Sequence, residues 1–220
     1  MSSAAIEQSA GAGLPDPLRE PWSKLERQRE AASLGMWLFL MSEMLFFGAV
    51  FLAFSFSRAL DVSAFQAAAR QTEISYGAAN TFVLVTSSLT MTLAVRAAGI
   101  ADRRLAARLL ALTAALGVAF LIIKGFEYRD DLARRLYPGP DFALGQNAAE
   151  IFWAFYWIMT GIHALHLAVG IGLVSRLAWL MRRSVISLAS PQLEVTSLYW
   201  HLVDAFWLVL FPVLYIAGRG

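Results

Sequence analysis

The sequence of 220 residues contains no cysteine and only three histidines. The absence of cysteine excludes disulfide bonds, thiolate zinc sites and iron–sulfur clusters. Charged residues are also scarce, at 15% of the chain, whereas soluble domains contain about 25%. No block of basic residues is present and the net charge is only +2. Nucleic-acid binding is therefore not expected, because it needs a clustered positive surface.

Apolar residues make up 58% of the chain and gather in five long runs. Each run is close to the roughly 20 residues that a helix needs to cross a bilayer. A spanning segment must satisfy its own backbone hydrogen bonds, which makes helix the expected state. We therefore predict an all-α fold, an integral membrane bundle of five transmembrane helices within residues 33–217. The predicted spans are about residues 33–57, 76–99, 105–127, 150–175 and 196–217.

The residues before the first run are small and polar. Residues 1–21 lack the apolar core of a secretory signal peptide. A flexible tail is expected over residues 1–32, as is common at chain ends. Within it, residues 22–30 fit either a short interfacial helix or a solvated linker.

Basic residues between the runs predict the orientation. Eleven Lys and Arg residues fall on the side of the N-terminus and six on the other side. Positive residues favour the cytoplasmic side, so the N-terminus is predicted in the cytoplasm and the C-terminus in the periplasm of a bacterial inner membrane. The eleven are Arg19, Lys24, Arg27, Arg29, Arg96, Arg103, Arg104, Arg108, Arg176, Arg182 and Arg183; the six are Arg58, Arg70, Arg129, Arg134, Arg135 and Arg219.

Five ionisable residues lie well inside the predicted spans, namely Glu43, His163, His166, His201 and Asp204. Such groups are costly in a bilayer and often functional. Glu43 is about 15 Å deep at 1.5 Å per residue, so it should be protonated or paired, with a histidine of the fourth span as partner. All five fall in the same half of the membrane, and we expect one buried polar cluster. Simple interhelical hydrogen bonding is the competing interpretation.

The third run is the least apolar, because Arg108 and Lys124 lie near its ends and have to reach outward. Lys124 and Glu127 are three residues apart on one helical face. An ion pair or contacts with lipid phosphates would explain them, and anchoring at the membrane boundary is the simpler expectation. Hydroxyl residues between Asn80 and Thr92 predict a helix-packing face. Aromatic residues near the span ends fit an interfacial belt: Tyr76, Trp153, Trp179, Tyr199, Trp200 and Tyr215.

None of these residues has the spacing of a metal or haem site. We therefore predict no catalytic, cofactor-binding or metal-binding residue in this chain. An independent ion or proton carrier that uses Glu43, His163 and Asp204 remains an alternative.

Five segments, taken together, resemble the cytochrome c oxidase subunit III family. They occur in the family's order within about residues 33–217. The segments are GMWLFLMSEMLFF (35–47), NTFVLVTSS (80–88), KGFEY (124–128), TGIHALH (160–166) and YWHLVDAFW (199–207). Many family members have seven spans, and five spans resemble the shorter bacterial form. Glu43 and Tyr199 resemble the cytochrome c branch more than the quinol branch.

The resemblance implies a non-catalytic subunit of a proton-pumping haem-copper oxidase of aerobic respiration. Subunit III packs directly against subunit I in a complex that also contains subunit II, and these partners hold the haem and copper. The family binds phospholipid in a cleft, expected here between the first two and the last three helices. It is thought to support proton uptake, oxygen access and stability during turnover, and Glu43 matches its carbodiimide-reactive acid. An accessory subunit of a nitric oxide reductase or of a quinol oxidase is the alternative.

Overall fold

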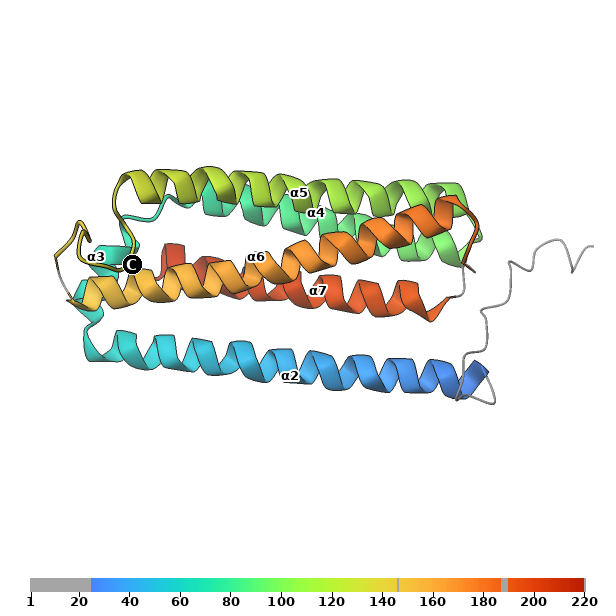
Figure 1. The fold of residues 1–220 in the computed structure, drawn as a ribbon, viewed down its shortest axis with the longest axis horizontal. Helices are drawn as coiled ribbons and strands as arrows, with labels where there is room; N and C mark the ends of the chain where they lie inside the picture. The colour runs from blue at the N-terminus through green and yellow to red at the C-terminus, as the bar shows by residue number, and fades with distance from the viewer. Residues whose placement is uncertain (1–24, 146, 187–189, 220) are drawn as a thin grey trace, which may run out of the picture.

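Residues 25–145, 147–186 and 190–219 are described by the structure, a computed structural model of the chain (Figure 1). Across these residues every regular element is helical, and five helices are long and apolar enough to cross a membrane. They are α2 (Leu25–Leu60), α4 (Ile74–Gly99), α5 (Arg103–Ala133), α6 (Asn147–Arg182) and α7 (Pro191–Phe211). The predicted all-α bundle with five spans is confirmed.

The spans are longer than the predicted ones. They cover Ser33–Leu60, Ile74–Gly99, Arg103–Ala133, Ala148–Arg182 and Pro191–Ile216. The apolar run marks only the part of a helix that lies in hydrocarbon, whereas the helix itself continues into polar ends. Of the tail predicted at residues 1–32, residues 25–32 belong to α2, while residues 1–24 lie outside the described part of the chain.

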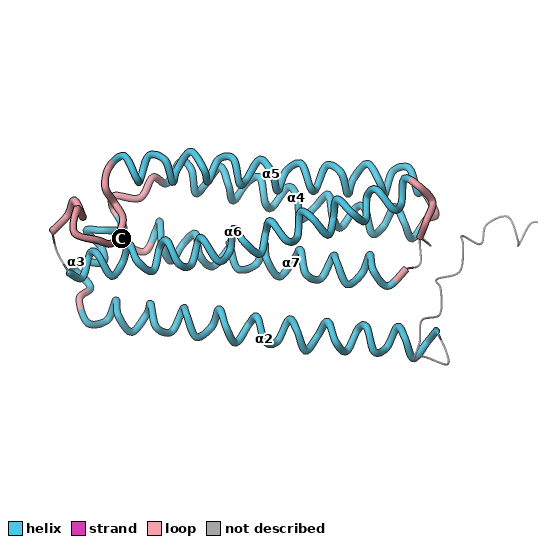
Figure 2. The backbone as a smooth tube through the Cα atoms, viewed as in Figure 1, coloured by secondary structure: helices cyan, strands magenta, loops and turns pink. Residues whose placement is uncertain are grey.

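Two ends of the bundle can be distinguished in Figure 2. At one end the short helix α3 (Val62–Ala69) lies near the C-terminus and the π-helical turn η1 (Pro212–Ile216); we call it the α3 end. The opposite end carries the turn between α4 and α5, and we call it the turn end. Asp61 caps α3 by accepting a hydrogen bond of 3.0 Å from the backbone N–H of Ala64. This contact lowers the pKa of Asp61, which lies outside the spans.

Small residues bring α4, α5 and α6 close together. Buried alanines line the α4–α5 contact, and Gly117 of α5 lies beneath Trp200 of α7. A Cβ atom at Gly117 would meet the Trp200 ring and Ile171 at 2.8 Å. Small side chains allow this close approach in membrane bundles.

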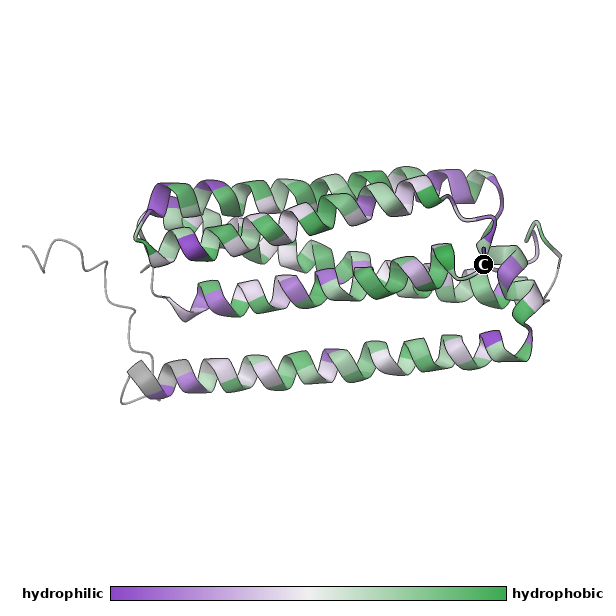
Figure 3. Ribbon diagram, turned by 180° about the vertical axis from the view of Figure 1, so that it is seen from behind, coloured by the Kyte–Doolittle hydropathy of each residue, from purple (hydrophilic) through white to green (hydrophobic). Residues whose placement is uncertain are grey.

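The helix α2 lies apart from this packed group. It contacts α6, α7 and α3, whereas α4 packs against α5 and α7. The helices therefore do not divide into the first two and the last three, as the expected cleft required. Only 17% of the apolar stretch of α2 is buried, against 33–44% for the other spans. The ribbons in Figure 3 show mainly apolar residues along the middle of the helices and more polar ones at their ends.

Candidate functional site in the membrane-spanning bundle

Glu43 of α2 pairs with His166 of α6, as predicted for Glu43 and a histidine of the fourth span. Glu43 Oε2 lies 3.0 Å from His166 Nε2, and the two side chains are 18% and 20% exposed. The other ring nitrogen, Nδ1, lies 2.9 Å from the carbonyl oxygen of Ile162. A carbonyl can only accept, so Nδ1 carries a hydrogen. One further proton is then shared between Nε2 and Oε2, and the pair has no net charge wherever that proton resides.

Aromatic side chains surround this pair. Phe47 lies edge-on to the His166 ring at 5.5 Å and stacks on Phe206 at 3.9 Å. Tyr199 of α7 donates a hydrogen bond of 2.9 Å to the His166 carbonyl. Apolar neighbours strengthen a polar contact by excluding water. The pair is therefore a partly exposed polar link between α2 and α6.

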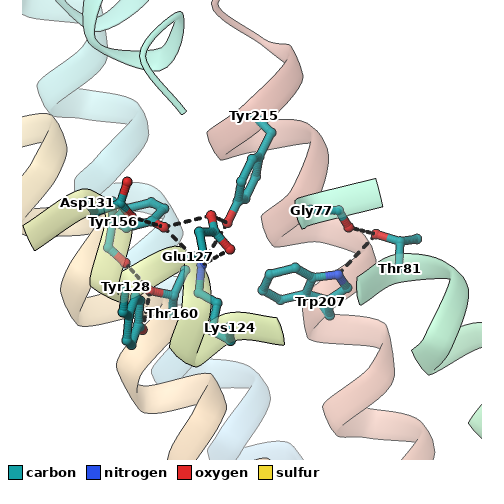
Figure 4. A network of polar contacts seen from close by, with 10 residues as sticks. All are labelled: Gly77, Thr81, Lys124, Glu127, Tyr128, Asp131, Tyr156, Thr160, Trp207 and Tyr215. Atoms are coloured by element: carbon teal, nitrogen blue, oxygen red, sulfur yellow. Dashed lines mark hydrogen bonds and ion pairs between the residues drawn. The ribbon is translucent and has the colours of Figure 1, made fainter. Parts of the chain in front are cut away.

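A second polar group lies inside the bundle around Lys124, and Figure 4 shows its hydrogen bonds. Lys124 Nζ donates to Glu127 Oε2 at 3.0 Å, to the Tyr156 hydroxyl at 3.0 Å and to the Tyr215 hydroxyl at 2.7 Å. These contacts use all three donors of an ammonium group. Lys124 and Glu127 are only 2% and 1% exposed. They are paired inside the protein and do not anchor at the membrane boundary, so that expectation is wrong.

The burial of Lys124 follows from the face of α5 on which it lies. Phe120, Lys124, Glu127 and Asp131 recur at helical spacing and all four are buried. This face points into the bundle, where two tyrosines and a carboxylate satisfy the ammonium. A lysine with a full set of protein partners has no need to reach the headgroups.

Hydrogen counting defines the protonation of the Lys124 network. Tyr156 contacts both Glu127 Oε1 and Asp131 Oδ2 at 2.8 Å, yet one phenol has one hydrogen. Glu127 Oε1 also accepts from Tyr215 at 2.6 Å. If Tyr156 donates to Glu127, Asp131 must be protonated to donate to Tyr156. That arrangement satisfies every group and leaves one positive and one negative charge, a net charge of zero.

The five residues expected in one cluster are divided among three places, because only Glu43 and His166 form a pair. His163 is fully buried against Phe120 and Trp207, at ring distances of 5.4 and 5.2 Å. Neither of its nitrogens has a hydrogen-bond partner among the described residues. Two side chains three residues apart on a helix point in directions that differ by about 60°, because three residues fall short of a full turn by that angle. That difference directs His166 toward α2 and His163 toward α5 and α7.

The remaining two members of the expected cluster lie between α4 and α7. His201 Nδ1 is 2.8 Å from the Ser88 hydroxyl. Asp204 is 5% exposed and lines a hollow of about 220 Å³ together with Ser88. Within the described part of the chain, its carboxylate oxygens have no hydrogen-bond partner. These residues therefore form a separate polar group where α4 and α7 meet, and it does not include Glu43 or His166.

Several hydroxyl residues of α4 form the predicted packing face, whereas Thr86 and Thr92 donate only to carbonyls of their own helix. Thr81 accepts a hydrogen bond of 3.0 Å from the indole N–H of Trp207. Ser87 accepts one of 3.2 Å from Trp200, and Thr90 bonds to Thr113 of α5 at 2.8 Å. Each contact joins α4 to a neighbouring helix, and such bonds are the usual polar link between membrane helices.

Comparison with known proteins places this arrangement in a family. The family model for cytochrome c oxidase subunit III matches residues 26–219. The chain belongs to the cytochrome c oxidase subunit III family. The cytochrome c oxidase subunit 3 of Thermostichus vulcanus is 31% identical, over 84% of this chain and 87% of that protein. The equivalent protein of Alkalihalophilus pseudofirmus is 30% identical, over 85% and 87%.

Quinol oxidases are also represented among the similar proteins. The protein named probable quinol oxidase subunit 3 of Staphylococcus saprophyticus is 27% identical, over 84% of this chain and 88% of its own length. This chain is thus a subunit III of the haem-copper oxidase family, whose members serve cytochrome c or quinol oxidases. Subunit III is a non-catalytic subunit of an oxidase complex and associates with other oxidase subunits in the membrane.

Three members of the Lys124 network in this subunit III were not expected there from the sequence: Asp131, Tyr156 and Tyr215. Asp131 follows Glu127 by four residues, and this spacing was the available signal. Tyr215 was expected in the interfacial belt, as were Trp153, Tyr199 and Trp200. All four side chains are buried, so the prediction that they belong to an interfacial belt is wrong. Trp179, by contrast, is 55% exposed. An aromatic residue near a span end can face the bundle as readily as the headgroups, and sequence position does not separate the two.

The histidines and acidic residues of this subunit III are spread over several helices. In that part of the chain, no group of three or more His, Asp or Glu residues is arranged to hold a metal ion. The histidines instead contact a carboxylate, aromatic rings and a serine. These contacts join neighbouring helices or fill the space between them.

Proposed function

We propose that this chain is the non-catalytic subunit III of a proton-pumping cytochrome c oxidase in the bacterial inner membrane. It packs directly on the catalytic subunit I, in a complex with subunit II, and these partners hold the haem and copper. Membership of the family and the similarity to proteins named cytochrome c oxidase subunit 3 support this role. The N-terminus lies in the cytoplasm and the C-terminus in the periplasm, as the basic residues predict.

The Glu43–His166 pair is the observation that carries the functional part of the proposal. It holds one shared proton, is partly exposed, and lies among aromatic rings. A purely structural polar link would be expected to be fully enclosed, as the Lys124 network is. We propose that the pair supports proton uptake and stability during turnover, and that this subunit also supports oxygen access.

The sparse packing of α2 supports phospholipid binding beside this pair. Large apolar side chains of α2 are exposed along most of its length, among them Trp37, Met44 and Phe46. Such a surface needs acyl chains or an apolar protein neighbour to cover it. We propose that bound phospholipid occupies the side of α2 near Glu43, in place of the cleft between two helix pairs that the sequence suggested.

Purification of the intact complex tests the proposed identity. The chain should co-purify in mild detergent with haem-containing oxidase subunits, identified by mass spectrometry and a visible spectrum. Reduced cytochrome c should then support oxygen consumption. Co-purification with a nitric oxide reductase would contradict the proposal.

A quinol oxidase is the second candidate, because proteins named probable quinol oxidase subunit 3 are 26–27% identical to this chain. The electron donor separates the two. Activity with a quinol and none with cytochrome c would replace the first candidate by the second.

The role of the shared proton is tested by Glu43→Gln in the complex. Gln keeps the shape and can donate to the neutral imidazole, but it cannot exchange the shared proton. We expect fewer turnovers before inactivation or a lower proton stoichiometry, with the chain still retained. Ser42→Ala, on the neighbouring exposed position of α2, is the matched control. Unchanged values in Glu43→Gln would show that the pair is a structural link alone.

A further inference from the structure

A groove bordered by arginines opens between α5 and α6 at the turn end of the bundle. It consists of two adjoining hollows of about 560 Å³ each, which share Ala111 and Arg182 among their lining residues. None of the residues around Glu43 contributes to it. The groove is therefore separate from the position proposed above for lipid near α2.

The arginines of this groove have few partners in the protein. Arg104, Arg108, Arg182 and Arg183 are all exposed. Among the described residues, no ion pair or hydrogen bond is formed by their guanidinium groups; Arg183 only lies over the Trp179 ring, at 5.6 Å. Arg103 differs, because it donates to the Ile186 carbonyl at 2.8 Å. Within the described ranges, no acidic side chain lines either hollow. Four exposed arginines, without an acidic partner in that part of the chain, thus converge on one groove.

The arginines at the α3 end are arranged differently. Arg58 and Arg70 donate to the carbonyls of Ala217 and Gly218 at 2.9 and 3.2 Å. Arg219 donates to the Tyr215 carbonyl at 3.2 Å, and Arg134 pairs with Glu73 at 2.9 Å. Most basic groups at that end close the fold, whereas those at the turn end remain available for an anion.

The walls of the groove are made of small residues that lead away from the arginines. Ala107, Ala111 and Ala114 line it on α5, and Ser175 and Ala178 line it on α6. At 1.5 Å per residue, Ala114 lies about 15 Å along the helix from Arg104, and Ser175 about 10 Å from Arg182. This depth is within the span, where the surroundings are hydrocarbon. Trp179, beside the arginines, is 55% exposed, as is typical of the interfacial region.

We propose that this groove binds an anionic phospholipid. The arginines hold the phosphate, for which guanidinium groups provide paired hydrogen bonds. One acyl chain lies along the alanines between α5 and α6. Basic pockets between helices at a membrane surface suit such headgroups. An acidic peptide fits less well, because the inner part of the groove would place its polar backbone in hydrocarbon.

Lipid binding to the intact oxidase complex tests this site. The complex is delipidated in detergent and placed in bilayers of phosphatidylcholine with a small fraction of phosphatidylglycerol, and retained lipid is measured by native mass spectrometry. Arg108→Gln with Arg182→Gln should reduce retained phosphatidylglycerol by about ten-fold or more, because two of the charged contacts to the phosphate are lost. Arg129→Gln with Arg135→Gln, at exposed positions of the α3 end, is the matched control. This double variant should change the amount of retained phosphatidylglycerol by less than two-fold. An equal loss in both pairs would show unspecific charge attraction and overturn the site.

A second pair of variants tests the acyl chain. Ala111→Phe fills the groove without changing its charge and should also displace the lipid. Leu112→Phe, on the exposed surface of the same helix, should not. Retention of the lipid in Ala111→Phe would show that no acyl chain lies in the groove, and equal competition by soluble glycerol phosphate would show a phosphate site that needs no lipid. Either result would overturn the proposal.

Discussion

The Glu43–His166 pair and the Lys124 network lie in differently packed parts of one bundle. Both consist of an acid and a base from the membrane-spanning helices. The first joins the sparsely packed α2 to α6 and has side chains 18–20% exposed, whereas the second is enclosed by α5, α6 and α7 at 1–2% exposure. The enclosed group uses every donor of Lys124, but the open pair has one contact and one shared proton. The two groups thus differ in how completely the protein satisfies and encloses them, although both join membrane-spanning helices.

The largest effect is expected from removing the base of the enclosed network. Lys124→Met leaves the Glu127 carboxylate buried without a cation, and breaking such a pair costs about 3–5 kcal/mol. The thermal unfolding midpoint of the complex, or the amount of chain in the membrane, should fall sharply. The double variant Lys124→Met with Glu127→Gln should recover part of the loss, because the unpaired charge is gone. A fully stable single variant would contradict the assignment of an ion pair.

A smaller effect is expected at Asp131, which is the protonated acid in the arrangement in which Tyr156 donates to Glu127. Asp131→Asn offers an N–H in place of that hydrogen, so stability should change by less than about 1 kcal/mol. The infrared absorption of a protonated carboxylic acid should lose one component in this variant. Glu127→Gln should not remove that component. If Asp131→Asn leaves the absorption unchanged, the proton resides elsewhere in the network.

The open pair should contribute less to stability than the enclosed network. Glu43→Ala removes the contact with His166, and a single hydrogen bond of this kind is worth about 0.5–1.5 kcal/mol. Glu43→Gln should cost less, since its amide can still donate to Nε2. Retention of the chain during purification of the complex gives the measurement. A loss as large as that in Lys124→Met would remove the distinction between the two regions.

The smallest effect is expected at Asp61, a carboxylate outside the spans that serves as a reference for both regions. Its pKa is lowered from 3.8, first by the hydrogen bond from Ala64. The cap is therefore fully stabilising above pH 3.8 and is lost as the pH falls through the lower folded pKa. Hydrogen exchange at the start of α3 should accelerate only in that acidic range. Asp61→Asn, which retains a capping side chain, should show no such pH dependence.

The apolar runs were sufficient to predict the helical state, the number of spans and the approximate limits of each span. Those properties depend on hydrocarbon thickness and on backbone hydrogen bonding, which act on each segment separately. The family motifs were equally visible, because they are short and local. The partner of Glu43 could also be expected, since a carboxylate at that depth needs a proton or a base.

The direction in which each side chain faces was decided only by the tertiary structure. Lys124 and Trp200 lie near span ends and were expected at the interface, yet both face the bundle interior. His163 and His166 are three residues apart and were expected together, yet they contact different helices. A rotation of some tens of degrees about a helix axis exchanges a lipid-facing position for a buried one. In a membrane helix that is apolar on all sides, the sequence carries little information about this rotation, and packing against the neighbouring helices determines it.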